Sequence, residues 1–395
     1  MTTTVVQPIP AKLRDKRKTA RLSPILRKDV ASNGPAWLPL VLVLSSFAAV
    51  AYADHLVVSI SLVYLYLLPL AVGAIFLRRE ISYSLIAVCI LFHDYYSPRS
   101  LHPGLRIFHN LSAAFSFAFI VYIIQRYIEQ REALAKTVQK QRDELLHDVE
   151  LAAQVQRLFL PVGKPAIAGL EIAGMMRPAR GVSGDYYDYI PINPHTIQFV
   201  IADVAGKGVP AALLMSATAA SMQLEANHDR NMLEIVQRLN TGIHSVSDDG
   251  ERFVTLLLAE LDVQKRTVQY INCGHNPALL FRAQTGTVTR LNSSCPPIGI
   301  LAEDPCQLAS ADLSAGDVLV FYTDGVTEAE NQLEEEFGTE RLASVLQRSS
   351  SLSAEGLKTD IFDSAANFCS GVGFNDDVTL LVVKCNFDGF STASS

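Results

Sequence analysis

The 395-residue sequence predicts an α+β domain that follows a bundle of membrane helices. Three observations lead to this prediction. Long uncharged apolar runs fill residues 36–125, and the 18% of charged residues in the chain is below the about 25% typical of soluble domains. Short β-branched segments appear from about residue 196, and tight turns join several of them. They do not alternate with helices in βαβ order, so a doubly wound fold is excluded.

Residues 1–35 form a basic arm with eight Lys or Arg residues and two Asp residues, whereas the whole chain has a formal net charge of −7. Such an arm could bind nucleic acid. Because it lies directly before an apolar run, a role in membrane orientation is the better interpretation, and we expect no nucleic-acid partner. A basic stretch of this length also argues against a cleavable signal peptide.

Residues 36–125 are expected to form a membrane domain with about four transmembrane helices. The apolar segments are Trp37–Ala53, Leu56–Leu77, Ile81–Tyr96 and Ile107–Ile124, and most approach the roughly 20 residues that cross a bilayer. Basic residues cluster before the first segment, between the second and third, and after the fourth. This pattern predicts a multi-pass protein of the inner membrane with its catalytic domain in the cytoplasm. The alternative is a set of buried helices in a soluble protein.

Polar residues at the ends of these segments, including His93, Asp94, His102 and His109, could bind a ligand or a metal. At membrane boundaries such groups more often face the interface. We therefore expect no sensing site there.

Residues 126–160 read as a helical linker that continues from the last membrane segment. Heptad positions a and d are Ile124, Ile128, Arg131, Ala135, Val138, Arg142, Leu145, Val149, Ala152, Gln156 and Phe159. Most are apolar, which predicts a short parallel coiled coil and hence a homodimer. The polar seam positions leave open an amphipathic helix that lies on its own catalytic domain. Pro161 is expected to end the helix.

Residues 161–385 contain the predicted catalytic domain, and residues 386–395 form a tail. The expected strands are Ile197–Ala202, Phe253–Leu261, Val268–Cys273, Ala278–Arg282, Asp317–Tyr322 and Val378–Val383. Short connections between several of them imply antiparallel pairing. Pro210–Leu224 and Met232–His244 are expected to be helices. Two sheets with helices outside them satisfy this order.

The six cysteines of the chain show no CxxC pair and no metal-ligand spacing with histidine. They are expected to be reduced thiols in a cytosolic region.

A glycine-rich stretch, "IADVAGKGVPAALLMS" from Ile201, raises the possibility of a nucleotide-binding loop. A Walker loop requires GxxxxGK[ST], but Gly208 stands where Ser or Thr should follow Lys207. The dinucleotide pattern GxGxxG also fails. A phosphate-binding loop of either kind is therefore not supported.

Aspartates at predicted strand ends offer a different chemistry. Asp203 and Asp324 each end an apolar strand, Asp376 and Asp377 precede the last strand, and Asp185 lies in "GVSGDYYD". Carboxylates brought together would repel one another unless divalent cations neutralise them. Oxygen ligands suit Mg²⁺ or Mn²⁺, and a pair of such ions can activate water for attack on phosphorus. A lone Asp-Gly, by contrast, is usually a turn.

An ordered set of motifs resembles the stage II sporulation protein E-like phosphatases, bacterial members of the metal-dependent (2C-like) protein phosphatase family. The motifs are "GVSGDYYD", "FVIADVAGKGVPAALLMS", "FVTLLLAELD", "VQYINCGHNPALLFR", "PPIGIL", "GDVLVFYTDGVTEAEN" and "NDDVTLLVV". The segment "ELAAQVQRLFLP" from Glu150 resembles the linker helix of stress-response regulator phosphatases. The resemblance covers about residues 148–385 and does not extend to the membrane half.

The resemblance implies an αββα sandwich with two Mn²⁺ or Mg²⁺ ions at one edge. Asp185 would bridge both ions, Asp203 and the Val204 carbonyl would hold the second, and Asp324 and Asp376 would hold the first. The implied activity is protein serine/threonine phosphatase. The implied substrate is a phosphorylated regulatory protein such as an anti-sigma-factor antagonist. The linker and the helix from Pro210 would switch metal binding.

Several further residues are expected near this site. Asp377 is expected to neighbour the metal ligands, and Asp188 is expected to contact Asp185 and support it without binding the metal. Arg180 is a candidate phosphate ligand, with an exposed charge as the alternative. Lys207 is expected to face solvent. His275, in "CGHNP", is expected to stabilise a turn rather than act as a general acid.

Two other functional classes compete with an active membrane-anchored phosphatase. One is a catalytically inactive signalling scaffold, which the full set of predicted ligands disfavours. The other is a sensor kinase with His147 as phospho-acceptor, in "ELLHDVE". Paired nucleotide-binding boxes for such a kinase are not recognisable in the sequence.

Overall fold

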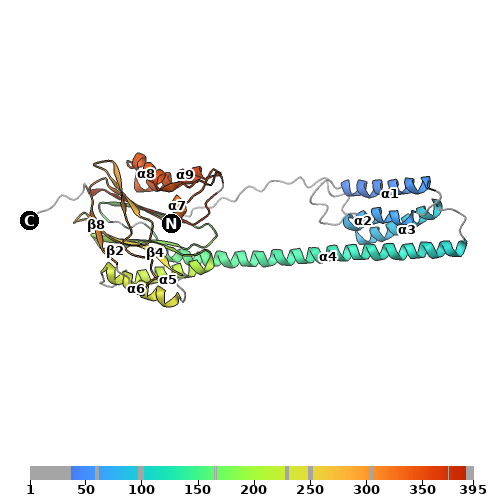
Figure 1. Ribbon diagram of the computed structural model, residues 1–395, viewed down its shortest axis with the longest axis horizontal. Helices are drawn as coiled ribbons and strands as arrows, with labels where there is room; N and C mark the ends of the chain where they lie inside the picture. Colours follow the sequence, from blue (N-terminus) through green and yellow to red (C-terminus); the bar gives the residue numbers. More distant parts are fainter. Residues whose placement is uncertain are drawn as a thin grey trace, which may run out of the picture. The chain divides into compact units, whose positions relative to one another are not determined.

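The computed structural model divides the chain into two units, Met1–Arg142 and Asp143–Ser395 (Figure 1). The boundary falls inside the linker predicted for residues 126–160. The structure describes residues 37–57, 62–96, 102–163, 165, 167–226, 231–247, 252–302, 306–371 and 373–387. The basic arm and most of the C-terminal tail therefore lie outside the described residues.

The first unit is helical. Its elements are α1 (Leu38–Leu56), a 3₁₀ turn η2 (Val63–Tyr66), α2 (Leu67–Phe76), α3 (Arg79–Tyr96) and the first part of α4 (Pro103–Gln156). Tyr66, Leu70 and Phe117 are among the buried residues of its apolar core. Large apolar side chains such as Leu44 and Phe115 are exposed on the outside of the same helices. A helix that is apolar on both its inner and outer faces is typical of a membrane protein.

The expectation of about four transmembrane helices is not supported. Among the described residues, two helices are long and apolar enough to cross a membrane, Leu38–Leu56 and Pro103–Phe159. The second predicted segment contains the shorter helix Val63–Phe76. The third forms α3, which carries Glu80 in its first turn and His93 in its last. Length and composition therefore identify two candidate spans in this part of the chain.

A buried polar cluster interrupts the apolar core of the first unit. His93 Nδ1 lies 3.1 Å from Asp54 Oδ2, and the Tyr66 hydroxyl donates to the same carboxylate at 3.3 Å. Asp94 accepts hydrogen bonds from Arg106 and Asn110. The expectation that polar residues here face the interface is thus wrong for His93, which is buried inside the helical bundle.

The second unit consists of two five-stranded antiparallel sheets. The first sheet has the order β1 (Leu170–Arg177), β10 (Val378–Cys385), β9 (Val318–Tyr322), β6 (Ala278–Arg282), β7 (Thr287–Leu291). The second has the order β2 (Asp185–Asn193), β3 (Thr196–Val204), β4 (Val254–Asp262), β5 (Thr267–Cys273), β8 (Ala309–Asp312). Antiparallel pairing was expected from the short connections, and it is observed throughout.

Helices cover the outer faces of this sandwich. The pair α5 (Val209–Ala226) and α6 (Met232–Val246) packs on the second sheet. The pair α8 (Gly338–Ser349) and α9 (Ala354–Phe368) packs on the first, next to the single turn α7 (Asp324–Thr327) (Figure 1). The α+β class and the αββα arrangement predicted from the sequence are therefore confirmed.

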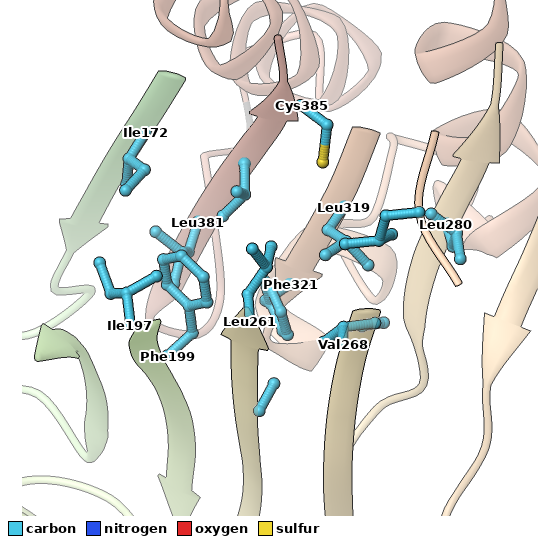
Figure 2. Packing of buried hydrophobic residues seen from close by; sticks show 14 of the residues in the cluster. Ile172, Ile197, Phe199, Leu261, Val268, Leu280, Leu319, Phe321, Leu381 and Cys385 are labelled. Carbon is cyan, nitrogen blue, oxygen red and sulfur yellow. The ribbon is translucent and has the colours of Figure 1, made fainter. Parts of the chain in front are cut away.

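Strand alternation decides which side chains reach the interior between the sheets. On β3, Ile197, Phe199 and Ile201 point inward and meet Phe321 and Leu381 of the opposite sheet (Figure 2). Val200 and Ala202 point outward to the helices. Because successive side chains alternate, Asp203 belongs to the inward-facing set, at the end of the strand.

The last part of α4 packs on the sandwich, as the amphipathic alternative for the linker requires. Val149 and Ala153 contact Val182 and Ala212. The Gln156 amide donates to the Ser183 carbonyl at 2.6 Å and accepts from the Ser183 N–H at 2.9 Å. Helix α4 ends at Gln156 and a 3₁₀ turn follows, so the helical conformation stops before Pro161, as expected.

Candidate metal centre

Asp185 and Asp203 are direct cross-strand partners at one end of the second sheet. Asp185 is buried, and its Oδ2 accepts hydrogen bonds from the hydroxyls of Thr323 at 2.7 Å and Thr379 at 2.6 Å. These threonines belong to the first sheet, at the end of β9 and in β10. The carboxylate of one sheet is thus fixed by hydroxyls of the other.

Asp324 and Asp376 reach the same end of the sandwich from the first sheet. Asp324 follows Thr323 directly, and Asp376 lies two residues before the start of β10. The two connections pass so closely that a Cβ atom on Gly325 would lie 1.9 Å from the carbonyl oxygen of Asp377. Only glycine fits at this position, because any side chain would push the two segments apart.

Burial and mutual repulsion raise the pKa values of Asp185, Asp203 and Asp324. Burial and the charge of Asp203 raise the pKa of Asp185 well above its usual range. Burial, followed by the charges of Asp324 and Asp376, raises the pKa of Asp203 to about 7. The pKa of Asp324 is raised by burial and by Asp376. Each negative charge here destabilises the others, and a bound cation would relieve that repulsion.

The donor atoms fit hard divalent cations. Carboxylate oxygens converge from both sheets, and backbone oxygen is available beside them. A Cβ atom on Gly184 would lie 3.3 Å from the Val204 carbonyl oxygen and 3.7 Å from Asp203 Oδ1, so these two oxygens flank the same backbone segment. Oxygen-only donors suit Mg²⁺ and Mn²⁺ rather than softer metals.

Lys207 provides the positive charge at this centre in the structure. Its Nζ lies 2.6 Å from Asp376 Oδ2, so the expectation that Lys207 faces solvent is wrong in part. The hydrogen bond to Asp376 raises the pKa of the Lys207 ammonium, and the neighbouring charge of Arg180 opposes that rise. Arg180 itself is exposed on the segment before β2.

We expect Lys207→Met to lower the Mn²⁺ concentration that gives half-maximal phosphate release by about two- to fivefold. The Lys207 ammonium competes with a metal cation for the Asp376 carboxylate. Because this ion pair is half-exposed and therefore weak, its removal changes the Mn²⁺ requirement only by this small factor. The measurement is a Mn²⁺ titration at saturating substrate. Lys265→Met is the matched control, because Lys265 pairs with Asp262 in a remote turn at 3.0 Å. A higher Mn²⁺ requirement would show that Lys207 assists the metal instead.

Asp377 positions the loop that precedes Asp185. Its carboxylate accepts hydrogen bonds from the Ala179 N–H at 2.7 Å, the Ser183 hydroxyl at 2.7 Å and the Gly184 N–H at 2.8 Å. Both carboxylate oxygens are used. The sequence prediction that Asp377 neighbours the site agrees with this location.

Asp188 points away from the other carboxylates. It lies on the outer face of β2 and accepts from the Tyr186 hydroxyl at 3.1 Å and the Gln223 amide at 3.3 Å. Residues three apart on a strand face opposite sides, so Asp188 contacts α5 rather than Asp185. This corrects the expectation that it supports Asp185.

His275 is buried beside the site, in a turn that the Asn272 side chain closes, whereas its own side chain contacts β4. Its backbone N–H donates to Asn272 Oδ1 at 2.8 Å, and its Nδ1 lies 2.8 Å from Thr255 Oγ1. Burial lowers the pKa of His275 to about 4, so the ring is neutral near pH 7. A neutral, enclosed imidazole is unsuited to donating a proton to a leaving group.

His275 should make the fold sensitive to acid. Its folded-state pKa of about 4 lies below the 6.5 of the unfolded chain. The stabilisation is therefore complete above pH 6.5 and is lost as the pH falls through 4, by up to about 3 kcal/mol. We expect His275→Asn to lose less stability than the parent chain over this range, as measured by denaturant unfolding. Parallel pH profiles for the two chains would contradict this.

Three contributors to the centre were not recognised from sequence as part of it, and the contact of a fourth, Lys207, was not foreseen. Thr323 and Thr379 stand next to predicted ligands in "YTDG" and "DDVT", which is the signal that could have indicated them. Gln156 and Lys207 act across distances that no local pattern encodes.

Comparisons with known proteins agree with this architecture. Residues 193–386 match the family described as stage II sporulation protein E (SpoIIE). The chain is 28% identical over 290 residues to phosphoserine phosphatase RsbU of Bacillus subtilis, covering 72% of this chain and 83% of RsbU. It is 27% identical over 265 residues to protein IcfG of Synechocystis, covering 60% of this chain but only 42% of IcfG.

A solved structure shows a similar fold. The SiaA-PP2C domain of Pseudomonas aeruginosa superposes with a TM-score of 0.55 at 19% identity, over 62% of this chain and 98% of that domain. At this identity the similarity concerns the fold alone.

Proposed function

We propose that this chain is a metal-dependent protein serine/threonine phosphatase, on the premise that its residues 193–386 match the family described as stage II sporulation protein E (SpoIIE). One observation carries the proposal. Asp185, Asp203, Asp324 and Asp376 come from two sheets and meet at a single edge, where burial and the neighbouring charges raise the pKa values of Asp185, Asp203 and Asp324. This disfavours the catalytically inactive scaffold, because repulsion among buried carboxylates only destabilises a domain that binds no metal.

The residues divide the work at this edge. Asp185 would contact two Mn²⁺ or Mg²⁺ ions, Asp203 with the Val204 carbonyl would hold one, and Asp324 with Asp376 would hold the other. When bound, the ions supply Lewis-acid activation of water and of the phosphoryl group. Thr323 and Thr379 keep the Asp185 carboxylate oriented, and Asp377 fixes the loop before it.

Two positively charged side chains at the edge of the site, Lys207 and Arg180, would position the phosphoryl group. Lys207 can exchange Asp376 for a phosphate oxygen when a metal ion takes over that carboxylate, and the exposed Arg180 lies near Lys207. Arg180 can bind phosphate with two parallel hydrogen bonds. A cavity of about 380 Å³, lined in part by Arg177, Phe374 and Asp376, adjoins this edge and can accept the polypeptide that carries the phosphate.

The proposed substrate is phosphoserine or phosphothreonine on a regulatory protein, such as an anti-sigma-factor antagonist. The similarity to RsbU, whose name describes a phosphoserine phosphatase and of which 83% is covered, supports this substrate class. We further propose that the two long apolar helices anchor the chain in the inner membrane with the phosphatase domain in the cytoplasm. The exposed apolar seam residues of α4, including Val138 and Leu145, would pair two chains as a coiled coil.

The deciding experiment uses the full chain in detergent micelles. We expect Mn²⁺-dependent release of phosphate from a phosphoserine peptide, loss of that release with a chelator, and its return when Mn²⁺ is added in excess. A chain that binds Mn²⁺ but releases no phosphate from any phosphoprotein would support the scaffold instead. ATP-dependent labelling of His147 would indicate a sensor kinase.

A further inference from the structure

Three cysteines that are far apart in the sequence meet on the outer face of the second sheet. Cys273 ends β5, while Cys295 and Cys306 lie in the connection between β7 and β8. The Cys273 sulfur is 3.7 Å from that of Cys295 and 3.9 Å from that of Cys306. Among the described residues, this is the one group of three or more potential metal ligands whose atoms all lie within 4.8 Å of one another.

The spacing of these sulfurs matches the edge of a thiolate coordination tetrahedron. Zinc–sulfur bonds are about 2.3 Å long, so two sulfurs of a tetrahedral site are separated by about 3.8 Å. Both sulfur–sulfur separations agree with that value to about 0.1 Å. The backbone already holds Cys273 and Cys295 side by side, because the two residues pair as an isolated β-bridge. The two sulfurs therefore reach this arrangement without a backbone movement.

We propose that Cys273, Cys295 and Cys306 bind one thiophilic d¹⁰ metal ion, Zn²⁺, at a site separate from the carboxylate centre. Soft thiolates select such a metal, whereas the carboxylate edge selects hard cations, so the two sites would not compete for the same ion. The proposal does not depend on the phosphatase activity.

The surroundings of the cluster favour binding. Cys273 and Cys295 are buried among apolar residues that include Ile235 and Leu239 of α6. Cys306 is partly exposed, which gives an entry path for the ion and a coordination position for water. Each thiol that is still protonated releases its proton when the metal binds.

The site would fasten the β7–β8 connection to the edge of the sheet. A Cβ atom on Gly274 would lie 2.5 Å from Pro297, and Val254 pairs with Ile298, so this connection already packs tightly against β4 and β5. Two residues after Cys273, His275 contacts Thr255, whose hydroxyl donates to the Asp203 carbonyl at 3.3 Å. A metal at the cysteines would therefore stabilise the strands that carry one proposed ligand of the carboxylate centre.

The test uses the full chain carrying Asp185→Asn, which weakens metal binding at the carboxylate edge. After chelator treatment under reducing conditions, Co²⁺ is titrated in and the thiolate-to-cobalt charge-transfer absorption is followed. We expect one equivalent to saturate the band and Zn²⁺ to displace it. Cys295→Ser should weaken binding by at least about 100-fold, whereas Cys385→Ser, which removes a buried thiol inside the sandwich, should leave it unchanged.

A second measurement does not depend on a folded variant. In the parent chain, Zn²⁺ should slow alkylation of Cys306 while alkylation of Cys369, on α9's C-terminal side, stays the same. The proposal is overturned if no charge-transfer band appears, if the band survives Cys295→Ser, or if Zn²⁺ leaves Cys306 alkylation unchanged. Recovery of Cys273 and Cys295 as a disulfide from freshly isolated chain with no bound zinc would also overturn it.

Discussion

Replacing Asp185 by Asn should lower Mn²⁺-dependent phosphate release by about 10³-fold or more, because the proposed bridging ligand supplies several kcal/mol of charge stabilisation to the reaction. The same variant should be more stable than the parent chain when divalent cations are absent. Asp185 is buried beside Asp203, and the amide removes a charge that is repelled there. Thermal unfolding in a chelator should show a higher midpoint for the variant, and added Mn²⁺ should stabilise only the parent.

Asp188→Asn is the matched control for this experiment. It changes the same functional group three residues along the same strand, but on the face that packs against α5. We expect its turnover to stay within a few-fold of the parent value. Full activity in Asp185→Asn, or equal losses in both variants, would show that the carboxylate edge is not the catalytic centre.

Replacing Gln156 by Ala should weaken Mn²⁺ activation by about 10- to 100-fold, the usual effect of removing a group that orients a metal ligand. The Gln156 amide satisfies both the N–H and the carbonyl of Ser183, two residues before Asp185. Its loss leaves two buried main-chain groups without partners, at about 1–3 kcal/mol each, and loosens the loop that carries Asp185. A Mn²⁺ titration of phosphate release measures the effect.

Gln154→Ala controls for general weakening of the helix, because Gln154 is exposed on the same turn of α4. It should leave the Mn²⁺ requirement unchanged. If both variants behaved like the parent chain, the linker helix would not influence the metal centre.

The strands that could be predicted from sequence are those with a clear pattern. The segments of β3, β4, β5, β6, β9 and β10 were expected because β-branched and apolar residues run between turn residues. Four strands were missed: β1, β2, β7 and β8. Aspartates and tyrosines dominate β2, "DYYDYIPIN", and the four small or acidic residues of β8 carry no apolar signal. Tertiary pairing, which no local window contains, specifies these strands.

The same distinction holds for the candidate metal centre, where some residues could be predicted from the sequence and others could not. The aspartates could be predicted because a Gly or Asn lies close to each, because Asp203 and Asp324 end apolar runs and Asp376 precedes one, and because Asp185 lies in a motif of the resembled family. Asp185 finds its hydroxyl partners 138 and 194 residues away, and Asp377 reaches Ala179 across 198 residues. The cysteine cluster was missed for the same reason, since its spacing along the chain resembles no known metal motif. Proximity in these cases follows from the order of strands in the sheets.

The hydroxyl groups that hydrogen-bond to Asp185 belong to the opposite sheet, so a shift of one sheet relative to the other would displace this proposed metal ligand. Heat or a bound effector that loosens the contact between the two sheets would abolish activity at a lower temperature than the one at which the domain unfolds. The temperature of inactivation should therefore lie below the melting temperature. The difference between the two temperatures should be smaller for Thr323→Ser, which keeps the hydroxyl, than for Thr323→Val.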